Sequence, residues 1–256
     1  MAGDQLVASP VARAVLRESV GFIGGGAAAL LQTAHPYVAK AIYDHSDVLS
    51  DPLTRFKRTF FFIFRMTFGD FQTVLRASRS LRKIHQRISG TLGGGDRQGG
   101  NTGSYAAGEA YSAHDREALK WVYATLLETN VFLQDMLVHE VSLENKTETL
   151  RYLAEGAVLF GLTPRDFPAD YDHFERYYFG VCHSPFLAVT KEGKEICDAL
   201  MRPILWDRWL PVVNTLKIVT GVLLPEPIAR QYGFNVGILP YIYTSLLLAL
   251  VQIVYG

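Results

Sequence analysis

Apolar residues recur every three to four positions through most of the chain, which is the spacing of amphipathic helices. This periodicity predicts helices over residues 27–40, 111–137, 145–160, 170–180 and 190–209. In the first of them, Pro36 is expected to bend the helix after His35. The pattern therefore predicts an all-α fold.

The segment from Asp51 to Gly90 is expected to contain two consecutive helices. Asp51 is a typical N-cap, and Pro52 fits a first helical turn. Four residues then share one face of the first helix: Arg55, Arg58, Thr59 and Phe62. The rest of this helix is apolar nearly all round, because it carries Phe60, Phe61, Ile63 and Phe64. We therefore expect the helix to be buried.

The second helix of this segment places His85 in an apolar stripe. The stripe follows the helical spacing and consists of Leu81, Ile84, His85 and Ile88. A buried neutral imidazole bound to haem iron, with the haem propionates paired to arginine, would explain both the stripe and the neighbouring cations. A core histidine bonded to a carbonyl, beside arginines paired with surface carboxylates, would explain them equally well. The spacing alone leaves both interpretations open.

The C-terminal segment from residue 238 to 255 approaches the ~20 apolar residues that span a bilayer. No charged residue follows Arg230. A membrane-spanning helix, a buried terminal helix and a helix docked on a membrane surface all fit this composition. Membrane contact through 238–255 is one expectation.

Composition limits the classes of function. Hydrophobic residues make up 49% of the 256 residues, so a substantial core is expected. Lys+Arg and Asp+Glu both number 25, and this balance argues against a nucleic-acid partner. The two cysteines, Cys182 and Cys197, are expected to be core thiols rather than a disulfide scaffold or zinc ligands. We divide the chain into an N-terminal extension (1–20), a main domain (21–235) and an apolar C-terminal helix (236–256).

Four local features complete the pattern. Charged residues interrupt the apolar segment 11–20, so no secretory signal is evident and an intracellular location is expected. The glycines at 24–26 superficially match a dinucleotide fingerprint, but without a preceding strand we expect them to allow close backbone approach, either to another helix or to a cofactor. The Gly-rich segment 91–108 is expected to be an irregular, mobile loop. His35 and His45 are expected to be pocket or capping residues rather than iron ligands.

Four blocks of sequence occur in an order that resembles the family of bacterial rubber oxygenase (latex clearing protein) and the ER-bound oxygenase of mycophenolic acid biosynthesis. They are GGGAAALLQTAHPYVAKAIYDHSD (24–47), DPLTRFKRTFFFIF (51–64), IHQRISG (84–90) and YSAHDREALKWVYATL (111–126). The resemblance covers roughly residues 20 to 185. It implies a single globin-like, multi-helix bundle around a haem b pocket, and use of O2 to cleave carbon–carbon double bonds of isoprenoid chains.

The resemblance also assigns roles to individual residues. His85 matches the proximal haem ligand, and Arg55 and Thr59 match an Arg-x-x-x-Thr pair over the open haem face. Arg58 takes the place of a lysine, which keeps the charge but not its shape. Two further departures are Tyr123, where many relatives have histidine, and Arg116, where proline is usual.

These observations predict a haem b-dependent oxygenase that uses O2 on an isoprenoid or other lipophilic small molecule. The alternative is a haem- or lipid-binding helical protein without turnover. A di-iron oxygenase is disfavoured, because the chain lacks paired Glu-x-x-His elements. A hydrolase is disfavoured by the absence of a Gly-x-Ser-x-Gly motif.

Overall fold

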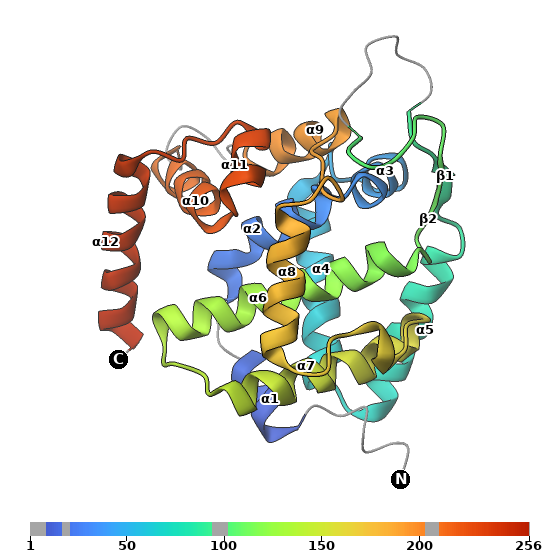
Figure 1. The fold of residues 1–256 in the computed structure, drawn as a ribbon, viewed down its shortest axis with the longest axis horizontal. Coiled ribbons are helices and arrows are strands. Elements are labelled where there is room, and N and C mark those ends of the chain that lie inside the picture. Colours follow the sequence, from blue (N-terminus) through green and yellow to red (C-terminus); the bar gives the residue numbers. More distant parts are fainter. Residues whose placement is uncertain (1–8, 17–20, 94–101, 203–209, 256) are drawn as a thin grey trace.

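The computed structural model describes residues 9–16, 21–93, 102–202 and 210–255, and these residues are mostly helical (Figure 1). The all-α prediction is confirmed, and the globin-like arrangement stays a prediction. The first half of the chain forms α1 (Pro10–Leu16), α2 (Gly21–Thr33), α3 (Pro36–His45), α4 (Pro52–Phe68), α5 (Phe71–His85), β1 (Ser89–Thr91) and β2 (Ala110–Ser112). The second half forms α6 (Arg116–Leu137), α7 (Leu143–Ala157), η2 (Val158–Phe160), η3 (Pro164–Asp166), α8 (Tyr171–Cys182), α9 (Lys191–Leu200), α10 (Leu210–Leu223), α11 (Glu226–Tyr232) and α12 (Ile238–Tyr255).

Helix α6 runs through the middle of the bundle and carries much of the core (Figure 1). Trp121 is fully buried and stacks on Tyr178 of α8, with ring centroids 5.5 Å apart. Its indole N–H donates to the carbonyl of Leu31 at 2.8 Å, which links α6 to α2. The indole thus buries a large apolar surface while its polar atom stays satisfied. Cys182 and Cys197 are free and buried in the same core, so the prediction of core thiols is confirmed.

The three consecutive glycines of α2 allow three neighbouring helices to approach closely. A Cβ at Gly24 would overlap Thr129 of α6, one at Gly25 would lie 2.9 Å from Phe56 of α4, and one at Gly26 would lie 2.7 Å from Thr220 of α10. Successive helical positions point about 100° apart, so each glycine serves a different neighbour. The glycines lie inside a helix, and their role is helix packing.

The helix predicted over 27–40 is broken rather than bent. Helix α2 ends at Thr33 and α3 begins at Pro36. His35 is the N-cap of α3 and adopts an extended backbone conformation, as a residue before proline prefers. Its Nδ1 accepts the Tyr37 amide N–H at 3.2 Å, so the expectation that His35 has a capping role is confirmed.

The segment around the β-hairpin differs from prediction in two ways. Residues 110–112 form β2 and pair with β1, with Ser112 opposite Ser89 and Ala110 opposite Thr91, so the helix expected from 111 begins only at Arg116. The described part of the expected mobile loop is held in place. Tyr37 donates to the Glu109 carboxylate at 2.5 Å, and Tyr105 Oη lies 3.0 Å from His35 Nε2. These side-chain bonds hold residues 102–109 in place, whereas residues 94–101 of the expected loop lie outside the described residues.

Acid sensitivity follows from the burial of His35. Desolvation lowers the pKa of His35 to about 3. Between pH 6.5 and that value, the unfolded chain binds a proton that the folded chain does not, so stability falls as the pH falls. From pH 7.5 to pH 5 this histidine alone should remove about 2 kcal/mol of folding free energy. We expect the free energy of unfolding, measured by denaturant titration, to decrease less over this range in His35→Asn than in the wild type. Parallel pH dependences in the two proteins would refute this role for His35.

Helix α12 matches the predicted C-terminal segment and packs on α10 and α6. Thr244 and Leu248 are buried, whereas the outward residues Ile238, Leu239 and Ile253 are each more than three-quarters exposed. None of the helices in the described residues combines the length and the apolar character needed to cross a membrane. Membrane contact through 238–255 stays a prediction.

Candidate functional site

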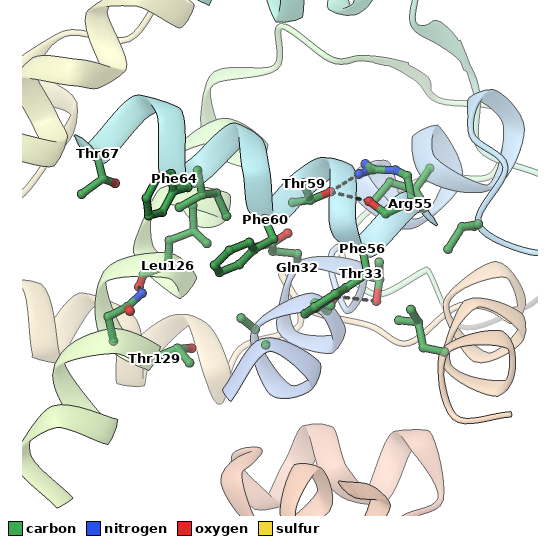
Figure 2. Close-up of a pocket in the computed structure, with 18 of the residues that line it drawn as sticks. Gln32, Thr33, Arg55, Phe56, Thr59, Phe60, Phe64, Thr67, Leu126 and Thr129 are labelled. Carbon is green, nitrogen blue, oxygen red and sulfur yellow. Dashed lines mark hydrogen bonds between the residues drawn. The ribbon is translucent and has the colours of Figure 1, made fainter. Parts of the chain in front are cut away.

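A pocket of about 260 Å³ lies between α4, α2 and α6 (Figure 2). Helix α4 forms one wall, and its lining residues are Arg55, Phe56, Thr59, Phe60, Ile63, Phe64, Thr67 and Phe68. Small residues of α2 open the opposite wall, where Ala28, Ala29, Gln32 and Thr33 line the space. Leu126, Thr129 and Asn130 contribute from α6. The pocket is mostly apolar, with a few polar groups, as is typical of sites for small molecules.

Arg55 and Thr59 are brought together on the pocket wall (Figure 2). The Arg55 guanidinium donates to Thr59 Oγ1, and that hydroxyl donates to the Arg55 carbonyl at 3.1 Å. Burial lowers the pKa of Arg55, and the charge of Arg58 lowers it further. Among the described residues, no carboxylate lies within ion-pair distance of Arg55. A partly buried cation without a counter-ion is suited to an anionic or strongly polar ligand.

The start of α4 follows the prediction, but its burial does not. Asp51 caps the helix and accepts the Thr54 amide N–H at 3.1 Å, with Pro52 in the first turn. The helix was expected to be buried nearly all round, yet Phe61 is 56% exposed and Phe64 is 51% exposed. Helix α4 lies at the surface, packs against α5, and lines the pocket shared with α2 and α6 with one face only. The prediction of a buried helix, which was based on its run of phenylalanines, is therefore wrong for the exposed face of α4.

Arg58 lies outside the pocket. Its side chain is 68% exposed and forms an ion pair with Asp47 at 3.6 Å. The pocket face of α4 runs through residues 55, 56, 59, 60, 63 and 64, whereas Arg58 points about 150° from the centre of that face. The structure thus gives Arg58 no contact with a ligand in this pocket.

His85 ends α5, which is connected to α4 only by Gly69 and Asp70. The ring is half-buried, and its pKa is lowered to about 4 by burial, by His114 and by the charge of Arg55. The His114 ring centroid lies 6.2 Å away. Ile84, expected in the same apolar stripe, is instead 54% exposed. His85 is therefore a neutral imidazole near Arg55, but it is not among the residues that line the pocket.

The residues present fit a haem in chemical type. His85 offers a neutral ring nitrogen, Arg55 offers a cation without a carboxylate partner among the described residues, and α4 offers an apolar wall. These are the groups that bind iron, propionates and the porphyrin faces. The pocket volume of about 260 Å³ lies just below the roughly 300–1,000 Å³ usual for ligand sites. A haem that contacts both Arg55 and His85 would require the pocket to extend toward α5.

Tyr123 and Arg116, which differ from the residues usual in the family, contact other side chains of the protein rather than the pocket. Tyr123 packs near Phe160 and Phe167, with ring centroids 6.2 and 6.1 Å away, and does not line the pocket. Arg116 donates to both carboxylate oxygens of Asp166 at 2.7 Å. The α6 residues that do line the pocket are Leu126, Thr129 and Asn130.

Sequence reasoning missed the α2 contribution to the pocket. Gln32 donates to Thr125 at 3.2 Å and lies on the lining beside Thr33. The available signal was the spacing Ala28, Ala29, Gln32 and Thr33, which places two small and two polar residues on one helical face.

The comparisons with known proteins identify one family. A family model described as "ER-bound oxygenase mpaB/B'/Rubber oxygenase, catalytic domain" matches residues 12–251. The match spans nearly the whole chain and includes every helix that lines the pocket. Searches of curated proteins and of solved structures found no match.

Proposed function

Because the chain belongs to the mpaB/B' and rubber oxygenase catalytic-domain family, we propose that it is a haem b-dependent oxygenase of lipophilic substrates. The family supports an oxygenase that uses O2 on a small molecule. We further propose an isoprenoid or similar substrate and oxidative cleavage of one of its C=C bonds. The observation that carries this proposal is the Arg55–Thr59 pair, which lies in an apolar pocket without a carboxylate partner among the described residues and close to a neutral imidazole.

His85 is the proposed iron ligand. Its lowered pKa keeps the ring neutral at pH 7, so a nitrogen lone pair is available for coordination. When bound, haem supplies the redox centre that O2 chemistry on an alkene requires. The side chains of this chain then bind, orient and exclude water.

Arg55 and Thr59 are the proposed polar groups at the reacting oxygen. The hydrogen bond from Arg55 holds the threonine hydroxyl in a fixed orientation. Because the guanidinium is already desolvated, its interaction with developing negative charge is stronger than it would be in water. Phe56, Phe60 and Ile63 exclude water from the same space.

The apolar lining supports a lipophilic substrate. The polar groups of the pocket are few, and its longest wall consists of α4 side chains with aromatic rings. An isoprenoid chain could gain contact along such a wall without leaving polar groups unpaired. Contact of α12 with a membrane remains part of this proposal, because its outward side chains are apolar.

Oxygen uptake tests the proposed reaction. We expect haem-loaded protein to consume O2 with squalene, an isoprenoid with several double bonds, and to form carbonyl products detectable by mass spectrometry. The matched control is squalane, which has the same skeleton without double bonds and should give background uptake. If haem stays bound but no O2 is consumed with either compound, the result would instead favour a haem- or lipid-binding protein without turnover.

A further inference from the structure

The positive charge of this chain is concentrated in one helical hairpin. Residues 52–87, which form α4 and α5, contain nine Lys and Arg residues but only one acidic residue, Asp70. The chain as a whole has a formal net charge of zero. The hairpin therefore has a large positive net charge, and the remainder of the chain has a negative net charge of equal size.

The cations of α5 form an exposed stripe. Arg76, Arg79, Lys83 and Arg87 are all exposed and follow one another at intervals of three or four residues, so they share one face of the helix and its C-terminal extension. Within the described part of the chain, none of the four lies within ion-pair distance of a carboxylate. Unpaired cations on one face produce a positive potential that attracts an anionic partner.

Exposed apolar side chains accompany these cations. Phe61 lies on the exposed face of α4 with Lys57 and Arg65, and half-exposed Phe64 lies where this face meets the pocket face. Ile84 is exposed on α5. Large apolar side chains within a cationic surface are typical of helices that lie in the interface of an anionic bilayer. The cations bind the headgroups, and the apolar side chains enter the boundary of the acyl chains.

The pocket connects to this same surface. Phe64 is half-exposed and also lines the pocket, together with its neighbours Phe60 and Phe68. Figure 2 shows Phe64 and Phe60 on the side of α4 that faces the pocket. A lipophilic compound dissolved in a bilayer would therefore meet the pocket at the docked face.

We propose that the α4–α5 hairpin docks the protein on an anionic lipid surface. An acidic protein would satisfy the cations, and a single-stranded nucleic acid would in addition stack its bases on Phe61. Neither accounts for exposed, aliphatic Ile84 or for an adjacent pocket with apolar walls. The exposed face of α12 differs, because that helix carries no charged residue and cannot distinguish anionic from neutral lipids. The docking site does not depend on the proposed oxygenase activity, although it would supply its substrate.

Vesicle co-sedimentation of the full chain tests the docking site. The probes are vesicles of phosphatidylcholine, with and without about a third of phosphatidylserine. We expect much stronger binding to the anionic than to the neutral vesicles, and weaker binding to the anionic vesicles at high salt. Arg76→Glu/Arg79→Glu should weaken this binding at least about tenfold, and Phe61→Ser should weaken it to a smaller extent. Both variants should retain the wild-type circular dichroism spectrum.

Matched controls separate this surface from general charge and hydrophobicity. Arg151→Glu/Arg176→Glu changes the same charge at exposed positions of α7 and α8, and Phe179→Ser removes an equally exposed phenylalanine of α8. Both controls should bind anionic vesicles like the wild type. Equal binding to neutral vesicles, or hairpin variants that bind like the controls, would overturn the proposal. Selective binding to a nucleic acid in place of vesicles would also overturn it. Vesicle binding by a protein that fails the squalene assay would leave the docking site standing and refute only the proposed reaction.

Discussion

Replacement of Arg55 by leucine is expected to lower the turnover number for O2 uptake by about 10²–10³-fold, the usual effect of removing a preorganised donor from a reacting oxygen. Leucine keeps much of the apolar contact along the pocket wall but removes the charge and the hydrogen bond to Thr59. Because Arg55 is not the proposed iron ligand, the protein should still bind haem. The measurement is the initial rate of O2 uptake per haem, with haem content taken from the absorption spectrum.

Arg58→Leu is the matched control for this substitution. It removes the same charge from the same helix, one turn away, at an exposed position outside the pocket. We expect its turnover to stay within about twofold of wild type, as is usual for surface substitutions. An equal loss in both variants would mean that the overall charge of α4 matters rather than the Arg55–Thr59 pair. Wild-type turnover in Arg55→Leu would remove Arg55 from the mechanism.

Replacement of His85 by alanine should weaken haem binding by more than about 100-fold, because it removes the only protein ligand proposed for the iron. His114→Ala is the matched control. The two rings lie 6.2 Å apart, and no role in haem binding is proposed for His114. The control should bind haem like the wild type, as judged by titration of the Soret absorbance.

A positioning role of His85 would give a different result from direct ligation. Free imidazole can occupy the space left by His85→Ala, so its addition should restore the wild-type haem spectrum if the ring ligates iron directly. His85→Ala with unchanged haem affinity would point to another ligand. Equal losses in His85→Ala and His114→Ala would indicate that the pair acts as a unit.

Several elements were predictable from the sequence because local chemistry determines them. Asp51 and Pro52 mark the start of α4 through capping and a preset φ angle. Gly161 ends the helical segment 143–160 because its φ of 96° is accessible to glycine at little cost. The apolar run 238–255 has no internal break, and α12 has the same bounds.

The burial of α4 was not predictable, because it depends on which neighbours cover each face. A phenylalanine-rich helix is usually buried, but Phe61 and Phe64 are exposed here. The spacing placed Arg55, Arg58, Thr59 and Phe62 together, whereas the pocket face runs along 55, 59 and 63. Arg55 and Thr59 lie where the two faces overlap, so the spacing predicted that they lie together, whereas Arg58 lies outside the pocket face.

The broken helix at Pro36 and the fixed loop at 102–109 depend on contacts between distant segments. Proline predicted a disturbance, but the break is stabilised by the cap from His35 and by its contact with Tyr105. Glycine content predicted mobility, and the bond from Tyr37 to Glu109 opposes it. Tertiary hydrogen bonds of this kind leave no local signature in the sequence.

Titration of the purified wild-type chain with haem b, followed by absorption spectroscopy, tests the central claim most directly. We expect a Soret band that saturates at one haem per chain and persists after removal of free haem by gel filtration, because His85 and Arg55 would hold the group at a single site. A titration that gives no saturable band, or haem that separates completely from the protein on the column, would contradict the proposed oxygenase chemistry.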